Sequence, residues 1–226
     1  LLGTGKRITE GTLVMKGGRI QAVGPAGKVA IPAGARKVDA KGRFVTPGLI
    51  DTHSHMGVYA TPHVRATADG NEMTDPTTPY VFSEHAFWPQ DPSIRHAVAG
   101  GVTTILVLPG SGNVIGGRAS VLKLRPRLEA RAMRFPGAPF GIKMAGGENP
   151  KRVYGTRKQQ PMSRMGSVSK LRRAFIAARE YAFDQKQYED DYAEWEEKYE
   201  AKEADSEAED PGKEPKRPAR NLGYET

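Results

Sequence analysis

Residues 45–55 read Val-Thr-Pro-Gly-Leu-Ile-Asp-Thr-His-Ser-His, and this stretch decides how the chain is interpreted. Leu49 and Ile50 predict a short buried strand that leads directly into two imidazoles. Because side chains alternate across a strand, His53 and His55 point to the same side and can converge on one metal ion. Neutral imidazole nitrogen is a good ligand for zinc and related divalent metals. The stretch therefore predicts part of a metal site, which other residues must complete.

Composition limits the chemistry that the chain can perform. With 226 residues, 38% of them hydrophobic, it is long enough for one large domain or two small ones. It contains no cysteine, so disulfides, thiolate nucleophiles and cysteine zinc sites are excluded, and a metal must be held by His, Asp, Glu or a modified Lys. No stretch approaches the roughly 20 apolar residues of a membrane span. We expect a soluble protein of the cytoplasm or periplasm with no membrane partner.

The charge of the chain is unevenly distributed. The net charge is +8, yet residues 180–210 hold 14 Asp and Glu against three Lys, which leaves the remainder strongly basic. A basic surface can bind nucleic acid, but the basic residues between Arg118 and Arg134 match no nucleic-acid motif and have little aromatic company. We therefore expect no nucleic-acid partner.

The first part of the chain predicts a small β module. Residues 11–24 contain two short apolar runs around a Lys-Gly-Gly turn, which indicates a hairpin, and residues 38–45 repeat the pattern around Ala-Lys-Gly. We assign residues 1–46 to this module, as part of a small β-sandwich.

The next part predicts alternating strands and helices. Residues 91–99 indicate a helix, and residues 101–108 form a continuous apolar run typical of a buried strand, so the order strand, helix, strand implies parallel pairing. A second unit is expected from a helix or loop at residues 121–133 and a strand at residues 139–144, which gives successive β/α units. Between them, residues 109–117 are rich in glycine but fit no phosphate-binding fingerprint, so we interpret them as a tight loop at a pocket mouth.

A long helix is predicted from Ser167 onward, with Ser167 or Ser169 as its cap. Its first half should pack on the domain through residues at helical spacing, namely Leu171, Phe175, Ala178 and Ala182. Its second half carries the aromatic residues Tyr188, Tyr192, Trp195 and Tyr199, which indicate an exposed helix with one packing stripe or, alternatively, a partner helix. Residues 204–220 are expected to be a flexible connector. We assign residues 184–226 to an extended acidic helix and charged linker.

Four motifs together resemble the amidohydrolase superfamily, and within it most closely the imidazolonepropionase-like amidohydrolases. They are the Pro-Gly-Leu-Ile-Asp-Thr-His-Ser-His stretch at residues 47–55, Ala-Gly-Gly-Val-Thr-Thr at residues 99–104, the glycine-rich run at residues 108–117, and Gly-Glu-Asn-Pro-Lys-Arg-Val-Tyr-Gly at residues 147–155. The motifs span most of the chain, and their joint match is specific where each alone would be modest.

The resemblance implies an α/β fold, a partial TIM-like (β/α)8 barrel whose first β/α units occupy residues 47–183, with the active site at the C-terminal ends of the strands. It also implies a divalent metal, zinc foremost, as one or two ions that activate water for attack on a carbon–nitrogen bond. His53 and His55 match the first two metal ligands. The expected small-molecule substrate is a non-peptide amide, a cyclic amide or a dipeptide.

The resemblance implies roles for further residues. Lys143, if carboxylated, or Glu148 could act as the catalytic metal-bridging group, and we favour Glu148 because it lies in the most distinctive motif. Asp51 is expected to support the histidine pair as a hydrogen-bond acceptor and not to bind the metal directly. Asn113 and Arg118 could bind a substrate carboxylate, although a structural role for Asn113 in its turn is equally open.

The chain departs from the family in its later ligands. Members need two further histidines and an aspartate from later strands, whereas no histidine follows Lys143 here. A complete barrel takes about 250 residues. We therefore expect the N-terminal part of a longer enzyme, or a chain completed by a second polypeptide, inactive by itself. The alternative is a noncatalytic amidohydrolase-like scaffold that forms a homo-oligomer through its acidic helix.

Overall fold

The computed structural model describes residues 5–225, and the chain forms two compact units that divide in the sequence between Leu49 and Ile50. In the first unit, strands β1 (Gly11–Lys16) and β2 (Arg19–Pro25) pair antiparallel. Gly17 and Gly18 join them with φ of 58° and 75°. Two positive φ values in a two-residue connection suit the right-handed twist of a hairpin, and only glycine adopts them without strain. The predicted first hairpin is confirmed.

The second predicted hairpin is wrong. Within described residues 38–45 the turn does form, since Arg43 N donates to Ala40 O (2.9 Å), but no strand flanks it. Phe44 is 77% exposed. A strand requires a neighbour for its backbone hydrogen bonds, and local alternation of side chains does not supply one.

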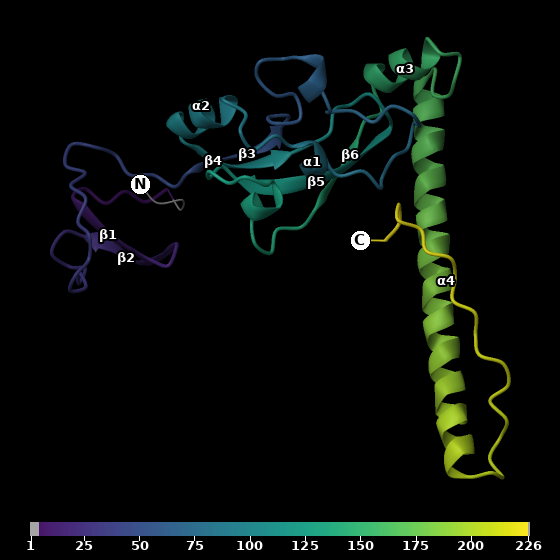
Figure 1. Cartoon of the computed structure of the whole chain (residues 1–226). Helices are drawn as coiled ribbons and strands as arrows, with labels where there is room; N and C mark the ends of the chain where they lie inside the picture. Colours follow the sequence, from purple (N-terminus) through teal and green to yellow (C-terminus); the bar gives the residue numbers. More distant parts are fainter. Residues whose placement is uncertain (1–4, 226) are drawn as a thin grey trace. The chain divides into compact units, whose positions relative to one another are not determined.

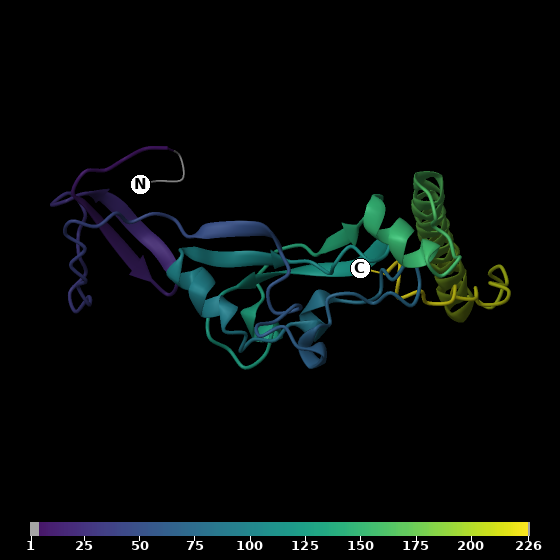
Figure 2. The ribbon, with the colours of Figure 1, turned by 90° about the horizontal axis from the view of Figure 1, so that it is seen from above.

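In the second unit, four strands form one sheet in the order β3 (Leu49–Ser54), β4 (Val102–Val107), β5 (Ile115–Lys123) and β6 (Gly141–Met144) (Figures 1 and 2). The C-terminal ends of β3 and β4 lie together, because Leu108 N donates to Ser54 O (2.9 Å). Helix α2 (Ser93–Ala99) precedes β4, as the sequence predicts. The fold is mixed α/β.

The predicted second β/α unit is wrong, because the chain turns straight back after β4. β5 pairs antiparallel with β4, and β6 pairs antiparallel with β5. The reversal uses the glycine-rich run, which continues into β5 instead of ending as a loop. Gly117 has φ of +112°, and a Cβ there would lie 2.5 Å from Val81 Cγ2, so no other residue fits this close approach. Residues 121–133 contain only the end of β5 and one 3-10 turn, Arg131–Met133.

The expected burial of β3 is also wrong. β3 is the end strand of the sheet, and Ile50 is 64% exposed. A strand that is buried on both faces needs layers on both sides, and the described residues do not provide them for β3.

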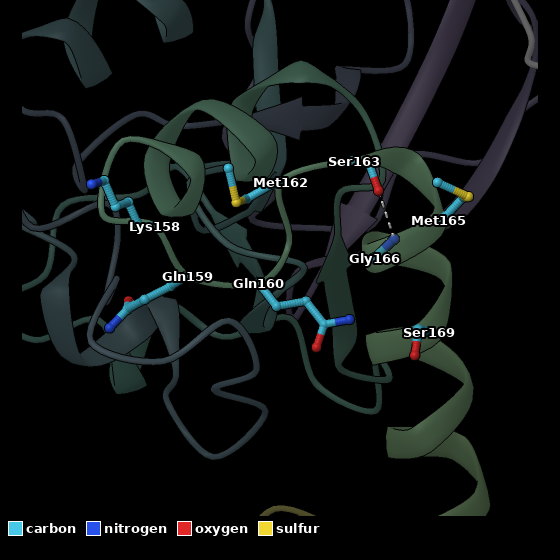
Figure 3. A pocket seen from close by; sticks show the side chains of 8 residues that line it. All are labelled: Lys158, Gln159, Gln160, Met162, Ser163, Met165, Gly166 and Ser169. Atoms are coloured by element: carbon cyan, nitrogen blue, oxygen red, sulfur yellow. Dashed lines mark hydrogen bonds between the residues drawn. The ribbon is translucent and has the colours of Figure 1, made fainter.

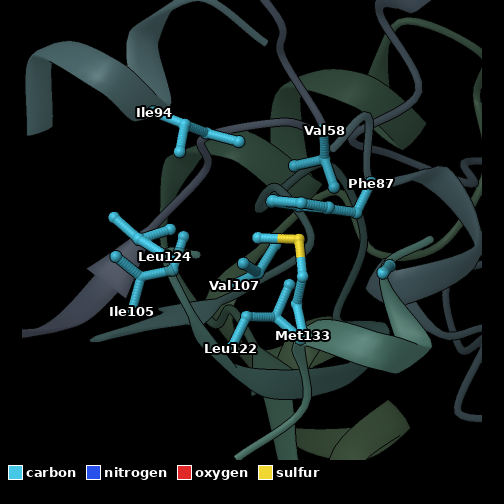
Figure 4. Packing of buried hydrophobic residues seen from close by; sticks show 9 residues of the cluster. Val58, Phe87, Ile94, Ile105, Val107, Leu122, Leu124 and Met133 are labelled. Carbon is cyan, nitrogen blue, oxygen red and sulfur yellow. The ribbon is translucent and has the colours of Figure 1, made fainter. Parts of the chain in front are cut away.

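The core lies beneath β4 and β5. Figure 4 shows its side chains converging from the two strands, from α2 and from the loops that follow β3 and β5. Its buried members are Val58, Phe87, Ile94, Ile105, Val107, Leu122, Leu124, Ala130 and Met133. This cluster holds β4 in place, and β4 in turn positions the loops at the C-terminal end of β3.

The described chain also contains the α-helices α1 (Ser83–Ala86), α3 (Glu148–Gly155) and α4 (Arg164–Ala204), and a 3-10 turn at Arg65–Thr67. The predicted caps of the long helix are wrong, because Ser163 caps α4 by accepting from Gly166 N (3.2 Å). The predicted packing of its first half also fails in part, since Phe175 is 59% exposed. Despite the 41 residues of α4, none of the described helices combines the length and apolarity needed to cross a membrane.

The segment expected to be a flexible connector instead folds back along α4. Residues 205–225, the return segment, run beside the helix in the opposite direction (Figure 1). Trp195 Nε1 donates to Gly212 O (3.3 Å), and Lys198 pairs with Glu209 (3.5 Å). The aromatic residues at helical spacing therefore lie on the helix face that contacts the chain's own C-terminal segment.

The far end of the return segment is held by Glu225. Tyr181 OH donates to Glu225 Oε1 (2.7 Å), and Arg220 forms an ion pair with the same carboxylate (2.6 Å). Hydrogen bonds from Arg220 and then Tyr181 lower the pKa of Glu225 to about 2. The carboxylate therefore stays charged, and keeps these contacts, at neutral pH.

Replacing Asp91 with alanine is expected to destabilise the second unit. Asp91 is buried, and its carboxylate accepts from three backbone amides: Gly57 N (3.1 Å), Thr61 N (3.3 Å) and Ser93 N (2.9 Å). Removing it leaves buried donors without an acceptor, so the free energy of unfolding should fall by about 2–4 kcal/mol in urea denaturation. Asp75→Ala removes an exposed turn carboxylate and should cost about 0.5 kcal/mol. Equal losses in the two variants would contradict this account.

Candidate metal and substrate site

The two histidines lie at the C-terminal end of β3, where strand alternation brings their rings together. The ring centroids of His53 and His55 are 5.3 Å apart, edge to face. Asp51 supports the pair through the backbone, because its Oδ1 accepts from His53 N (2.9 Å). The strand thus presents two imidazoles side by side, as the sequence predicts.

The tautomer of His55 follows from its hydrogen bond. His55 Nδ1 lies 2.8 Å from Leu108 O, and a carbonyl oxygen only accepts, so Nδ1 carries the proton. The lone pair is then on Nε2. A backbone partner that fixes the tautomer and ring orientation in this way is typical of metal-binding histidines.

Lys143 reaches the histidine pair from β6. Its Nζ lies 3.3 Å from His53 Nε2, although the two residues are 90 positions apart in the sequence. The residue is only 9% exposed, and burial lowers the pKa of its amine. A lowered pKa makes the neutral amine more accessible near neutral pH. The sheet therefore assembles two imidazoles and one buried lysine at one place.

Glu148 has a different environment. It is the first residue of α3, its side chain is 78% exposed, and it forms an ion pair with Arg152 one turn later (3.4 Å). The structure thus places Lys143 beside the histidines and Glu148 in a solvent-exposed pair.

Asn113 is fully buried in the loop between β4 and β5. Its Nδ2 donates to Glu72 O (2.8 Å), Asp75 O (3.2 Å) and Thr78 Oγ1 (2.8 Å). Its Oδ1 is buried without a hydrogen-bond partner among the described residues. These contacts fix the loop that runs past residues 72–78, and a contact of Asn113 with substrate stays a prediction.

Arg118 is a buried residue of β5 that joins separate segments. Its Nε donates to Pro79 O (3.1 Å), its guanidinium lies over the Phe82 ring (5.3 Å to the centroid), and its Nη2 donates to the backbone oxygen of Glu225. Arg118 therefore attaches the return segment to the sheet. Its predicted contact with a substrate carboxylate is untested.

Two residues beside the site were not identified from the sequence. The Tyr59 ring lies 5.7 Å from that of His55, and its hydroxyl accepts from Asn71 Nδ2. Asn71 Oδ1 in turn accepts from Gly112 N (2.8 Å). This chain of contacts connects the histidine strand to the glycine-rich loop, and burial raises the pKa of Tyr59. The only sequence signal for it was the glycine-rich loop itself, where a Cβ on Gly110 would lie 2.4 Å from Asn71.

The donor set is suited to a metal but incomplete. Within residues 5–225, no group of three or more His, Cys, Asp or Glu side chains is arranged to hold a metal ion. In their unmodified form, His53, His55 and Lys143 offer only nitrogen atoms as ligands. A hollow between the end of α3 and the start of α4 lies elsewhere, lined by Lys158, Met162 and Ser169 among others and by none of the predicted site residues (Figure 3).

Comparisons with known proteins point to one family. An amidohydrolase, tasK, of Hapsidospora irregularis is 43% identical over 157 residues, which cover 66% of this chain and 16% of that protein. The imidazolonepropionase of Cereibacter sphaeroides is 30% identical over 142 residues, covering 56% of this chain and 36% of the relative. No model of a known protein family matches the chain.

A solved structure gives the same indication for the fold. The crystal structure of an amidohydrolase from Thermotoga maritima superposes with a TM-score of 0.66 at 32% sequence identity, covering 94% of this chain and 48% of that one. The curled half-barrel sheet of the second unit is consistent with this neighbour. The chain spans less than half the length of each of these three proteins.

Replacing Asn113 with aspartate is expected to be more damaging than replacing it with alanine. Aspartate would place an anionic oxygen where Nδ2 now donates to Glu72 O and Asp75 O. Two acceptors facing one another in a buried site should lower the free energy of unfolding by about 3 kcal/mol or more, against about 2 kcal/mol for Asn113→Ala. Urea denaturation of both variants measures the difference. If Asn113→Asp were as stable as the unmodified chain, the proposed orientation of the amide would be wrong.

Proposed function

Because the chain belongs to the imidazolonepropionase-like amidohydrolases, we propose that it forms part of a metal-dependent hydrolase of carbon–nitrogen bonds. The substrate class is a non-peptide amide, a cyclic amide or a dipeptide. The observation that carries the proposal is the convergence of His53, His55 and Lys143 at one end of the sheet.

In this proposal the histidines hold a divalent metal, with zinc as the expected ion. His55 is prepared for the role because Leu108 O fixes its proton on Nδ1 and leaves Nε2 free. His53 Nε2 faces Lys143 Nζ at 3.3 Å. A bound metal would supply Lewis acidity and an activated water for attack on the substrate carbon.

Lys143 is our proposed third group at the site. As a free ammonium it is a cation that competes with a metal for His53 Nε2. As a carboxylated lysine it becomes an anion with two oxygen donors, and burial of the amine favours the neutral form that carboxylation requires. Glu148 remains the alternative, but it would have to leave its pair with Arg152 and turn inward from solvent.

In this proposal, the remaining ligands of the site lie outside residues 5–225. Since the chain spans less than half of its relatives' length, we propose that further ligands and the proton-transfer group come from the remainder of a longer protein or from a second polypeptide. The noncatalytic scaffold remains the alternative, and it predicts no specific metal binding.

The histidine pair can be tested by metal content. In the full-length protein, His53→Ala combined with His55→Ala should reduce bound zinc, measured by elemental analysis and by titration calorimetry, by at least about tenfold because both nitrogen ligands are lost. His96→Ala, an exposed residue on α2, serves as the matched control and should keep the full zinc content. Undiminished zinc in the double variant would sink the proposal, and absence of zinc from the unmodified protein would favour the scaffold.

A second comparison separates Lys143 from Glu148. Lys143→Arg keeps the positive charge but cannot be carboxylated, so we expect it to lower both zinc stoichiometry and hydrolysis of a panel of cyclic amides and dipeptides, by about 100-fold in kcat/KM. Glu148→Gln should change the same quantities by about threefold or less, because its side chain lies in solvent. The reverse ranking would assign the bridging role to Glu148.

A further inference from the structure

Helix α4 has two opposite faces with different surroundings. One face carries Tyr181 and Trp195, which contact the return segment. The opposite face has a stripe of exposed side chains that recur every three or four residues along the whole helix. We call it the outer stripe, and its residues are Met165, Val168, Arg172, Ile176, Arg179, Phe183, Lys186, Asp190, Ala193, Glu197, Ala201 and Ala204.

The two halves of the outer stripe differ in both charge and size. The first half is apolar and basic: Met165 is 82% exposed, and the charged positions are Arg172 and Arg179. The second half has three alanines and is mainly acidic through Asp190 and Glu197, and its one basic residue, Lys186, pairs with Asp190 on the same helix (3.1 Å). Large exposed apolar side chains at helical spacing, on the face away from the chain's own packing, indicate an interaction surface.

The stripe is complementary to itself when reversed. If a second α4 runs antiparallel, with the twofold axis between residues 184 and 185, Arg172 faces Glu197 of the second copy and Arg179 faces Asp190. In the same register Met165, Val168 and Ile176 face Ala204, Ala201 and Ala193 of the second copy, so each large side chain meets a small one. Phe183 and Lys186 meet at the axis.

We propose that the outer stripe is a dimer interface, and that its occupant is the outer stripe of a second copy of this chain in antiparallel orientation. The twofold arrangement uses the same surface on both copies, as closed dimers do. Alanine opposite a large side chain permits close helix packing, and paired charges set the register. A parallel arrangement would place arginine against arginine and acid against acid, so charge selects the antiparallel one.

Charge reversal tests the register in the full-length protein by analytical ultracentrifugation. We expect a dimer, and we expect Arg172→Glu with Arg179→Glu, or Asp190→Arg with Glu197→Arg, to raise its dissociation constant about 100-fold. The variant with all four substitutions restores both pairs and should restore the dimer. Arg173→Glu with Glu189→Arg, on the flanks of the stripe, is the matched control and should leave the dimer unchanged. A monomeric unmodified protein with normal helix content, or a fourfold variant that stays monomeric, would overturn the proposal.

Because the sequence contains no cysteine, disulfide cross-linking can test directly which residues of the two helices face each other. Ile176→Cys and Ala193→Cys are each prepared alone and then mixed under oxidising conditions. The proposed register predicts a disulfide between the two different variants. Neither variant should cross-link with itself, because like positions lie about 25 Å apart along the antiparallel pair. Self-linked Ile176→Cys would instead indicate a parallel pair or another register and would refute the arrangement.

Discussion

The candidate site depends on the backbone of Leu108. Its N–H donates to Ser54 O (2.9 Å), and its carbonyl accepts from His55 Nδ1 (2.8 Å). One residue at the end of β4 therefore fixes both the end of β3 and the ring that we propose as a metal ligand. The position of Leu108 is itself set by the buried side chains of Ile105 and Val107. The orientation of the half-buried His55 imidazole is thus a property of the hydrophobic core.

Local patterns in the sequence predicted those features that depend on a few neighbouring residues. Strand alternation placed the rings of His53 and His55 on one side, and two glycines predicted the turn between β1 and β2. Helical periodicity identified α4, although its start was misplaced because Ser163, Ser167 and Ser169 are equally good caps in the sequence. Where the pattern itself determines the structure, prediction from sequence succeeded.

The remaining features depend on contacts between distant segments. The contact of Lys143 with His53 requires β5 to run antiparallel to β4. The glycines at positions 116 and 117 did not indicate in the sequence whether the strand would run parallel or antiparallel. The same is true of Tyr59 and Asn71, whose roles appear only when the glycine-rich loop packs on them. The return segment has the composition of a disordered linker, yet it is held by bonds to aromatic and charged side chains of α4. Composition indicates how much apolar surface a segment can bury by itself, but it does not indicate which hydrogen bonds and ion pairs the segment can form with a neighbouring helix.

The attachment of both ends of α4 and its return segment has an evolutionary consequence. The arm formed by α4 and the return segment is attached to the rest of the unit at two places. At its start, Tyr154 OH in the preceding helix α3 donates to Asp75 O (2.7 Å), and at its end, Arg118 donates to the backbone oxygen of Glu225. Between Tyr181 and Arg220, the cited contacts join α4 to the return segment and not to the sheet. Whole helical turns can therefore be gained or lost at its tip without displacing a strand. The contacts that hold the sheet in place set no limit on the length of this arm.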